Sequence, residues 1–590
     1  MSFGRHSLMV RLTHHARRAV TTHPPKGPKA HRLSVRALVL VALALSVLFG
    51  ETAAGAVGGL PLVKASTAHR SSKATSAPRA NQLDGDQVAT SRGNDYRDGW
   101  YPDQPELTPR LVSSSTFGQL FATQLNGQIY AQPLIVGKVL LVVTETNWVY
   151  GLNPVTGAIE WSRQIGTPFL DKSLGCADLT PDLGVTSTPA IDPSTGIAYI
   201  VDQAFAGQPR HIGWFMNAIN PATGAEMPHF PIEIKGPASN NPKQPFTPTK
   251  ELQRPALLFL GDVVYAAFGS HCDFAPFAGF IVGVSTSGRQ TTLWTDEGTV
   301  SGGGGGIWQT GGGLVSDGPG QILFASGNGF GDASHPNGPI PGSSPPANLA
   351  DSVVRLVVQP DGSLKPKNFF SMNNDVVVDR KNGDLVGVAA LPAQFSAPNY
   401  PHLLVATGKL GFVYLLNRDS LGGVGEGPGG KDLVLGEYGP IGQVFSTPGA
   451  WPGDGGYVYV STVADASGGA GRVDAYKFTT SPNGLPGLRL VGTSSQPTFF
   501  GVSGPVVTSA GTSSGTAVVW VVSAGNLQAY DPIPVQGKLV LLGSWPIGDS
   551  TPFNAPGIGD NTLYVGNLNG MLYGFGKKVP GAGLARGTRS

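Results

Sequence analysis

Cysteine and charge are both scarce in this chain of 590 residues. It has two cysteines, Cys176 and Cys272, which lie 96 residues apart, and only 13% of its residues are Asp, Glu, Lys or Arg. Two cysteines at this spacing exclude a CxxC redox pair and a four-cysteine zinc site. The chain also lacks a Walker loop, an HExxH motif and any long apolar pattern at a spacing of 3.6. These absences argue against a P-loop enzyme, a zinc peptidase and a helical protein.

The one long apolar run lies near the N-terminus. Met1–Arg36 holds eight Lys or Arg and no acid, Ala37–Gly50 is a run of 14 apolar or small residues, and Ala54-Gly55-Ala56 follows. This order is typical of a secretory signal, so residues 1–56 are predicted to direct the chain out of the cytoplasm. The unusually long basic region leaves a retained signal-anchor open as the alternative. A membrane span needs about 20 apolar residues, so the shorter run favours cleavage.

The basic character of the whole chain belongs to this N-terminal segment. The chain has a net charge of +2, and without residues 1–56 it keeps 32 bases and 37 acids, a net charge of −5. No basic stripe remains to neutralise phosphates, so nucleic acid is not an expected partner. Residues 57–94 lack apolar periodicity and predict a disordered linker, and residues 578–590 predict a flexible basic tail. The folded domain is expected over residues 95–577.

Glycine and proline, by contrast, are abundant, with 84 and 49 residues, and they punctuate a repeat of short strands. The clearest unit is Tyr130–Trp161, in which apolar strands alternate with turns at Gly137-Lys138 and Asn153–Gly157. Asn, Pro and Gly supply the fixed or left-handed backbone that tight turns need. Strands this short cannot bury their faces alone, so several units must pack together to make a core.

Copies of this unit continue along the chain. Prolines that each precede an apolar strand recur at intervals of 56, 66, 57 and 51 residues, and one interval of 193 residues has room for two more units. The anchoring residues are Pro133, Pro189, Pro255, Pro448, Pro505 and Pro556. This spacing predicts an all-β fold, a β-propeller of eight four-stranded blades. The last unit lacks an outer strand after Phe575, and Leu111–Gln124 is expected to supply it and close the ring.

The first unit carries a family resemblance. Leu152–Trp161, LNPVTGAIEW, resembles the repeat of PQQ (pyrroloquinoline quinone) quinoprotein alcohol dehydrogenase-like propellers, with its signature small–apolar–Asp/Asn–x–x–Thr–Gly–x–x–x–Trp. The glycine run Ser301–Gly313 and His271-Cys272-Asp273 are similar to a secreted bacterial branch of this family. The resemblance covers about Leu111–Gly576. It implies the propeller fold and leaves the activity open.

Loops of several units are expected to meet on one face of the propeller. In this fold the segment that enters strand 1 of a blade and the loop that joins strands 2 and 3 lie on the same face, around the central channel. The candidates for a ligand face there are Asp178, His271, Asp273, Trp308, Gln309, Asn328 and Lys409. In one interpretation, Trp308 fills the core and the charges are solvated loop tips. In the other, Trp308 is the stacking floor of a pocket and Lys409 binds an anionic or carbonyl group.

The resemblance also implies what an active quinoprotein would need. In the resembled dehydrogenases Glu, Asn and Asp hold calcium against the PQQ cofactor, an Asp acts as base, and two adjacent cysteines stack over the quinone. Such oxygen ligands suit calcium, but they cannot be matched residue by residue here, and the two cysteines are not adjacent. The sequence therefore favours a secreted binding or interaction scaffold with no catalytic residue, metal or cofactor assigned. A PQQ- and calcium-dependent dehydrogenase of an alcohol or sugar is the alternative, and an unrelated hydrolase is a third interpretation.

The two cysteines are predicted to form a disulfide. A signal sequence directs the chain to an oxidising compartment, and the loops of Cys176 and Cys272 belong to the same face of adjacent blades. A metal site made of both thiolates, His271 and Asp178 is the competing interpretation, and it would need four ligands in tetrahedral geometry.

The expected partner is an extracytoplasmic protein or a glycan, and the chain itself is expected to be a monomer. A protein partner would leave an apolar patch on one face. A glycan would favour exposed aromatic side chains, for which Trp100, Tyr101, Phe499 and Phe500 are the candidates.

Overall fold

The computed structural model describes residues 90–175, 179–207, 210–299, 301–329, 341–374, 381–464 and 470–578, and the backbone of residues 585–586. All of them fall in one compact unit. The predicted signal segment, residues 57–89 of the linker, Cys176, Asp178 and most of the basic tail lie outside this part of the chain, so those predictions stay predictions. Residues 90–94, assigned to the linker above, belong to the folded ring, because Arg92 is fully buried in it.

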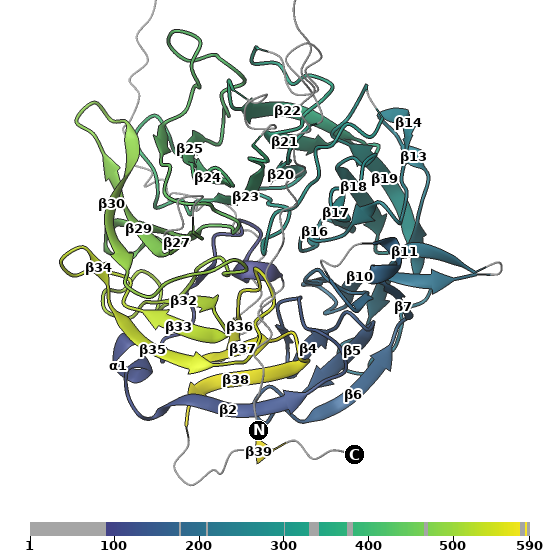
Figure 1. Ribbon diagram of the computed structural model, residues 1–590, viewed down its shortest axis with the longest axis horizontal. Coiled ribbons are helices and arrows are strands. Elements are labelled where there is room, and N and C mark those ends of the chain that lie inside the picture. Colours follow the sequence, from purple (N-terminus) through teal and green to yellow (C-terminus); the bar gives the residue numbers. More distant parts are fainter. Residues whose placement is uncertain are drawn as a thin grey trace, which may run out of the picture. The chain divides into compact units, whose positions relative to one another are not determined.

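Eight antiparallel sheets stand around a central axis and form a ring (Figure 1). The prediction of an all-β propeller with eight blades is confirmed. Blade 1 consists of β3 (Leu134–Val136), β4 (Val139–Val143), β5 (Trp148–Leu152) and β6 (Ile159–Gln164), and blade 2 of β9 (Ala190–Ile191), β10 (Ala198–Ala206), β11 (His211–Ile219) and β12 (Ile232–Ile234). Blade 3 consists of β16 (Leu258–Leu260), β17 (Val263–Ser270), β18 (Phe280–Ser285) and β19 (Arg289–Thr295), and blade 4 of β20 (Gln321–Ala325), β21 (Ser352–Val358) and β22 (Leu364–Ser371). The inner strand of blade 4 is reduced to one bridge, between Val315 and Leu323.

The second half of the ring repeats the pattern. Blade 5 consists of β23 (Leu385–Ala390), β24 (Leu403–Gly408), β25 (Val413–Asn417) and β26 (Gly436–Tyr438), and blade 6 of β27 (Gly449–Trp451), β28 (Tyr457–Ser461), β29 (Val473–Thr480) and β30 (Pro486–Ser494). Blade 7 consists of β31 (Val506–Thr508), β32 (Val518–Ser523), β33 (Asn526–Tyr530) and β35 (Leu541–Pro546), and blade 8 of β36 (Gly557–Gly559), β37 (Thr562–Gly566), β38 (Met571–Lys577) and β2 (Phe117–Gln124). Short strands extend some blades or form a separate hairpin: β1 (Trp100–Tyr101), β7 (Thr167–Leu170), β8 (Asp182–Leu183), β13 (Pro237–Ala238), β14 (Asn241–Pro245), β15 (Glu251–Leu252), β34 (Lys538–Leu539) and β39 (Ala585–Arg586). None of the helices in the described ranges is long and apolar enough to span a membrane.

The N-terminal strand β2 closes the ring, as the missing outer strand predicted. It pairs with β38 in antiparallel register from Phe117 opposite Lys577 to Gln124 opposite Met571. The predicted strand range, Leu111–Gln124, is too long at its start. The short helix α1 (Pro109–Val112) occupies that start, where Thr108 accepts a hydrogen bond from the Leu111 amide and proline stands at the first helical turn.

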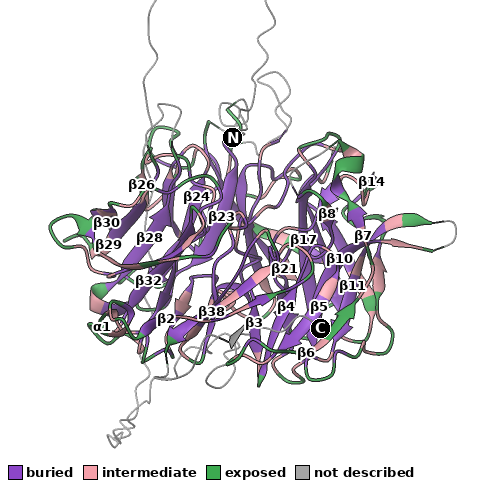
Figure 2. Ribbon diagram, turned by 60° about the horizontal axis from the view of Figure 1, so that its bottom comes forward, coloured by how far each residue is buried: buried purple, intermediate pink, exposed green. Residues whose placement is uncertain are grey.

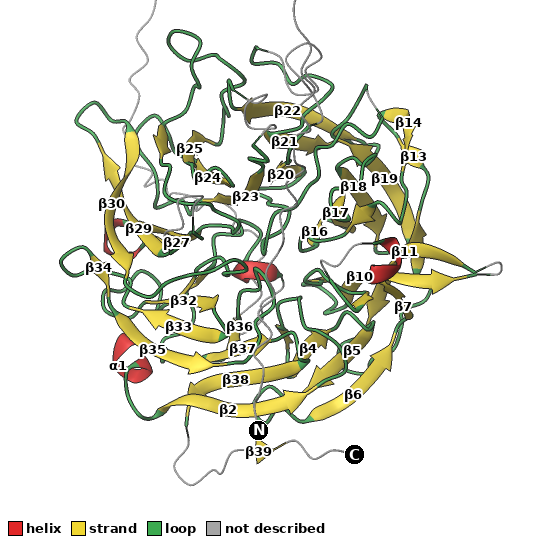
Figure 3. Ribbon diagram, in the orientation of Figure 1, coloured by secondary structure: helices red, strands yellow, loops and turns green. Residues whose placement is uncertain are grey.

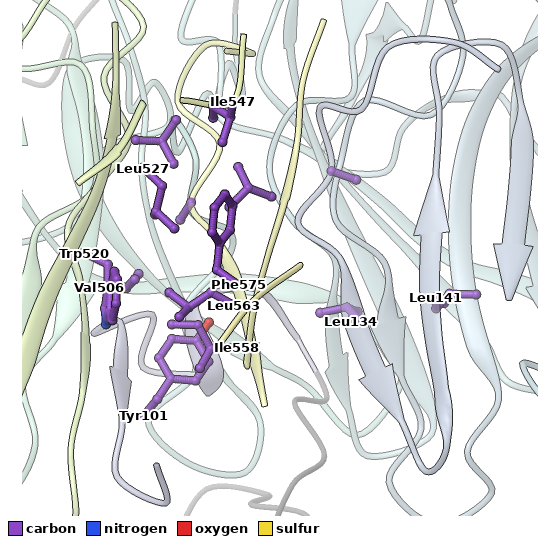
Figure 4. Close-up of a cluster of buried hydrophobic side chains, with 14 of the residues drawn as sticks. Tyr101, Leu134, Leu141, Val506, Trp520, Leu527, Ile547, Ile558, Leu563 and Phe575 are labelled. Carbon is purple, nitrogen blue, oxygen red and sulfur yellow. The ribbon is translucent and has the colours of Figure 1, made fainter. Parts of the chain in front are cut away.

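Apolar side chains fill the spaces between neighbouring blades. Trp520 of β32, Phe575 of β38 and Leu141 of β4 come from three successive blades and belong to one buried cluster (Figure 4). The strands are correspondingly buried along the ring, whereas exposed residues collect in loops and outer strands (Figure 2). Each blade therefore buries its faces against its neighbours, which is how short strands can build a large domain.

The Asn153–Gly157 turn of the first unit also joins two blades. Asn153 accepts hydrogen bonds from the amides of Val155 and Thr156, at 3.0 and 3.1 Å, and so forms the predicted turn. Trp161 ends the same motif, and its indole nitrogen donates to the carbonyl of Pro221, 2.8 Å away in the corresponding turn of blade 2. The motif thus works as a connector between repeats.

A segment that precedes the first blade fills the middle of the channel. It contains the short 3₁₀ helix Ser91–Gly93, which lies near the axis of the ring (Figure 3). Its backbone binds inner strands of several blades; for example, Ala450 and Val507 donate to the carbonyls of Asp98 and Gly99. We call residues 90–101 the channel plug.

Two buried arginines hold the channel plug in place. Arg92 donates to the carbonyls of Pro448 and Pro505 at 2.7 and 2.9 Å. Arg97 donates to the carbonyls of Leu314 and Leu257 at 3.0 and 2.9 Å. Burial lowers the pKa of each guanidinium to about 10, which leaves both charged at neutral pH. Four blades are tied to the axis in this way, two by each arginine.

Candidate functional site at the mouth of the channel

A pocket of about 250 Å³ opens at one end of the channel, and we call it the central pocket. Much of its wall comes from segments that lead into the inner strands, so most blades contribute a side chain. It brings together Asp273, Trp308 and Lys409, three of the candidates predicted from the sequence. These residues come from blades 3, 4 and 5 and meet because entry segments and strand 2–3 loops share this face.

Trp308 lies half-buried in the wall of the central pocket, and its ring packs against Gly269 and Gly327. A Cβ atom added to Gly269 would stand 2.8 Å from the indole ring, and one added to Gly327 would stand 3.1 Å from it. Real Cβ atoms do not tolerate the first distance, so glycine is needed for the ring to lie flat against these strands. One side of the indole therefore packs on backbone, and the ring still lines the pocket.

Lys409 is held beside Trp308 by an ion pair. Its ammonium group pairs with the carboxylate of Asp384 and donates a hydrogen bond to the Asn382 side chain at 3.1 Å. The other oxygen of Asp384 accepts from the Asn328 backbone amide at 2.6 Å. The pair is partly screened from water, since the side chains are 19% and 5% exposed. The cation thus has a fixed position in the pocket wall.

An aromatic cluster continues the wall beside Lys409, whose ammonium group lies 5.9 Å from the centre of the Phe445 ring. The rings of Phe445, Phe500 and Phe553 pack against one another at centroid distances of 5.3, 6.2 and 5.5 Å. Phe500 is 70% exposed and its neighbour Phe499 is 52% exposed, although most phenylalanines of the described chain are buried. Exposed aromatic rings at a pocket mouth offer apolar contact to a ligand.

A second cation, Arg254, lines the central pocket near its base. Its guanidinium donates to the Pro552 carbonyl at 2.9 Å and lies 5.8 Å from the centre of the Tyr130 ring. Burial lowers the pKa of Arg254, and Tyr130 and the buried Glu145 oppose that shift. The pocket therefore combines two cations with aromatic surface.

The other predicted candidates take structural positions or fall outside the described residues. His271 is 1% exposed beneath the loop, 3.9 Å from Asp171, and burial lowers its pKa to about 4. Gln309 is buried, donates to the Gly313 carbonyl and accepts from the Ala325 amide at the end of β20. Asn328 stands at the edge of the Lys409 network, bonded to Asn382 at 2.8 Å. Asp178 lies outside the described residues.

Several residues of the central pocket escaped the sequence analysis. Asp384, Arg254, Phe445 and Phe553 were not singled out, although Arg254 stands directly before the anchoring Pro255. The residue before each such proline leads into an inner strand, so this position was a usable signal. Trp100 and Tyr101, in contrast, are not exposed aromatics: Tyr101 is 3% exposed, and β1 pairs with β31.

The residues at hand fit a planar anion better than a calcium-bound quinone. Trp308 offers a flat surface, and Lys409 and Arg254 offer positive charge. For a metal, the amide oxygen of Asn328 is buried without a hydrogen-bond partner among the described residues, and the Asp384 carboxylate is close to it. Calcium takes six to eight oxygens, however, and no group of three or more His, Cys, Asp or Glu suited to a metal occurs in the described ranges. No catalytic step through a quinone is derived.

Comparison with known proteins gives a fold but no close relative. No protein-family model and no curated protein matches the chain. The quinohemoprotein alcohol dehydrogenase of Comamonas testosteroni is similar with a TM-score of 0.59 and 16% identity, over 86% of this chain and 83% of that one. The quinohemoprotein alcohol dehydrogenase ADHIIG of Pseudomonas putida HK5 has a TM-score of 0.55 and 13% identity, over 85% and 82%.

Two further structures are similar with lower TM-scores. A europium-containing methanol dehydrogenase has a TM-score of 0.51 and 15% identity, over 83% of this chain and 98% of its own. BamB from Moraxella catarrhalis has a TM-score of 0.47 and 12% identity, over 78% and 99%. At these identities the likeness concerns the fold alone. The chain has the eight-bladed propeller fold of quinoprotein alcohol dehydrogenases, as the resemblance in its sequence predicted.

Proposed function

We propose that this protein is an extracytoplasmic binding propeller whose central pocket takes a planar small molecule with a negative charge or a carbonyl group. The observation that carries the proposal is the half-buried Trp308 ring, laid on glycines beside the fixed ammonium group of Lys409. A flat ligand can stack on the indole while its acidic or carbonyl group meets the cation. The extracytoplasmic location rests on the signal predicted in residues 1–56.

The surroundings of Trp308 support a ligand pocket over a simple core position. Arg254 adds a second positive charge, and Phe445, Phe500 and Phe553 add apolar surface. A ligand pocket typically combines such apolar walls with a few fixed polar groups. The exposed Phe499 and Phe500 also suit contact with a larger partner at the same mouth, which is the scaffold side of the proposal.

The test is calorimetric titration with flat anions, using PQQ, with and without calcium, as the first probe. Trp308→Ala should abolish binding while the melting temperature stays near that of the wild type. Lys409→Gln should weaken binding by about tenfold or more, because a hydrogen bond to a charged group contributes about 1.5–3 kcal/mol. Lys538→Gln removes the same charge from an exposed strand and is the matched control. If Trp308→Ala instead lost about 3–5 kcal/mol of stability and kept binding, Trp308 would be a core residue.

A PQQ-dependent dehydrogenase is the second candidate, and one observation favours it. The unpartnered amide oxygen of Asn328 next to Asp384 could contribute to a metal site that further groups complete. Absorbance and mass spectrometry of protein mixed with PQQ and calcium test for a bound quinone. Reduction of a dye by that complex in the presence of an alcohol would show dehydrogenase activity. A complex without such activity would support the binding function instead.

A further inference from the structure

A second pocket, of about 340 Å³, lies between blades 4 and 5, and we call it the lateral pocket. Asn373 and Asn374 follow the outer strand β22, Phe412 and Tyr414 come from the strand 2–3 loop and β25, and Glu437 lies on β26. The pocket shares the Gly408–Leu410 loop with the central pocket, but its polarity is reversed. Its wall carries two carboxylates, Asp432 and Glu437, in place of two cations.

The inner part of the lateral pocket is apolar and aromatic. Met372, Leu410 and the rings of Phe412 and Tyr414 line it, and the two ring centres are 6.3 Å apart. Tyr414 also packs on Phe370 at 5.4 Å, so its ring is held in one place. An alkyl chain could lie along this surface with its hydrophobic area removed from water.

The hydroxyl group of Tyr414 is the unexplained feature of this pocket. The residue is only 4% exposed and lines the pocket, and no hydrogen bond to its hydroxyl is found among the described residues, so that oxygen is open to the pocket. Polar groups of largely buried side chains are normally hydrogen-bonded, so a hydroxyl left open at a pocket wall is free to bond a ligand. A ligand or water in the pocket would supply the missing bond.

The two carboxylates stand close to this hydroxyl. Tyr414 is directly opposite Glu437 in the β25–β26 pairing, which puts both side chains on one face. Asp432 is fixed by a 2.7 Å hydrogen bond from the Asn373 amide. Burial raises the pKa of Tyr414, and both carboxylates raise it further; burial and Asp432 likewise raise the pKa of Glu437. Three oxygen acceptors thus gather over an aromatic floor.

We propose that the lateral pocket binds a primary alkylammonium group, either of a free amine or of a lysine side chain. An ammonium group has three N–H donors and no acceptor, which matches the oxygens of Asp432, Glu437 and Tyr414 in number and kind. Its positive charge offsets the repulsion between the two carboxylates, and the aromatic rings favour a cation above their faces. A neutral polyol could bond the same oxygens but would leave that repulsion in place. Lys431 lies exposed on the rim and is the only cation among the lining residues.

The proposal is tested by calorimetric titration of the full chain with cadaverine, a diamine, and with 1,5-pentanediol, its neutral counterpart. Wild-type protein should bind cadaverine and not the diol. Glu437→Gln should weaken cadaverine binding by about tenfold, since a charged hydrogen bond becomes a neutral one. Tyr414→Phe keeps the ring and removes only the hydroxyl, so it should weaken binding by about fivefold. Glu426→Gln removes one exposed acid of the same loop outside the pocket and should leave binding unchanged.

The source of the ammonium group is separated by a further probe. Binding of Nα-acetyl-lysine-N-methylamide as tight as that of cadaverine points to a lysine side chain, and its exclusion points to a free amine; either result supports the site. The proposal is overturned if cadaverine does not bind, if the diol binds equally well, or if Glu437→Gln binds like the wild type at an unchanged melting temperature. Trp308→Ala should not affect cadaverine binding, so this test is independent of the function proposed for the central pocket.

Discussion

The middle and the open end of the central channel are lined by the same ring of blades, but their cations have opposite surroundings. In the channel plug, Arg92 and Arg97 donate to backbone carbonyls of four blades and lie wholly within the protein. At the open end, Lys409 and Arg254 line a pocket, and aromatic rings beside them stay partly exposed. Hydrogen bonds satisfy most donors of the first pair, although Nη1 of Arg92 has no partner among the described residues, whereas the second pair lines the pocket.

This difference separates structural charge from functional charge. A buried cation whose donors mostly bind carbonyls of the chain stabilises one arrangement of that chain and has little to offer a ligand. A cation held by one carboxylate at a pocket wall keeps donors for a ligand, and the field of a low-dielectric site strengthens the contact. Mutations in the channel plug should therefore change stability, and mutations at the open end should change ligand binding.

Removal of residues 100–126 should have the largest effect on the ring. Deleting residues 100–126 removes β1 and β2, so β38 becomes an unpaired edge and the channel plug loses its connection. Exposed edges pair with other chains, and we expect aggregation in place of a monomeric ring. Size-exclusion chromatography and soluble yield measure this outcome. A deletion variant that stays soluble and melts like the wild type would contradict closure by β2.

Arg97→Met should have the next largest effect. Methionine keeps much of the apolar stem and removes the donors to Leu257 and Leu314, whose buried carbonyls then lack those partners. We expect a loss of about 3–5 kcal/mol in the free energy of unfolding, with ligand binding by the folded fraction unchanged. Arg110→Met, on the exposed helix α1, is the control and should change stability by less than about 0.5 kcal/mol. A small loss in Arg97→Met, measured by denaturant unfolding, would mean that the plug is not structural.

The ring could be predicted from the sequence because its signals are local. Strands that alternate with Pro and Gly turns recur along the chain, so each repeat unit can be recognised within a stretch of about sixty residues. The channel plug gave no such signal. Arg92 binds carbonyls 356 and 413 residues away, and a lone arginine in a linker-like stretch does not reveal partners at that distance.

The central pocket was predictable in part for the same reason. Topology alone placed Trp308 and Lys409 on one face, since it fixes which loops meet. It did not reveal that His271 points into the protein and not into the pocket, nor that Asp384 would pair with Lys409. Those outcomes depend on side-chain packing between blades, which no local pattern encodes.

The disulfide between Cys176 and Cys272 stays a prediction, because Cys176 lies outside the described residues. It would tie blades 2 and 3 together at the open end of the channel. Closing a loop of 96 residues stabilises the folded chain by about 4–5 kcal/mol in the chain-entropy model, and disulfides typically contribute about 2–4 kcal/mol. Peptide mapping without reduction should recover the linked pair, and Cys272→Ser should lower the melting temperature. Two alkylatable thiols in secreted protein would rule the bridge out.

The smallest expected effect is a dependence of stability on pH caused by Glu145, a buried carboxyl group on the face of the open end. It accepts hydrogen bonds from the Gly184 amide at 2.9 Å and the Thr186 hydroxyl at 3.1 Å, and its second oxygen has no partner among the described residues. Burial raises the pKa of Glu145 from 4.5 to about 7 in the folded chain. Between these two values the folded state holds a proton that the unfolded state has released, so stability falls as pH rises through this window.

Above pH 7 both states are ionised, and the full cost of burying the charge, up to about 3 kcal/mol, is present. Glu145→Gln keeps an acceptor for Gly184 and Thr186 without the charge, so it should melt higher than the wild type at pH 8 and nearly equal to it at pH 4.5. Glu426→Gln, an exposed acid, should show no such difference. Melting curves of the three proteins across this range decide the point. A Glu145→Gln variant that is less stable than the wild type at pH 8 would mean that Arg254 compensates the buried carboxylate, and that the open end is as well satisfied as the plug.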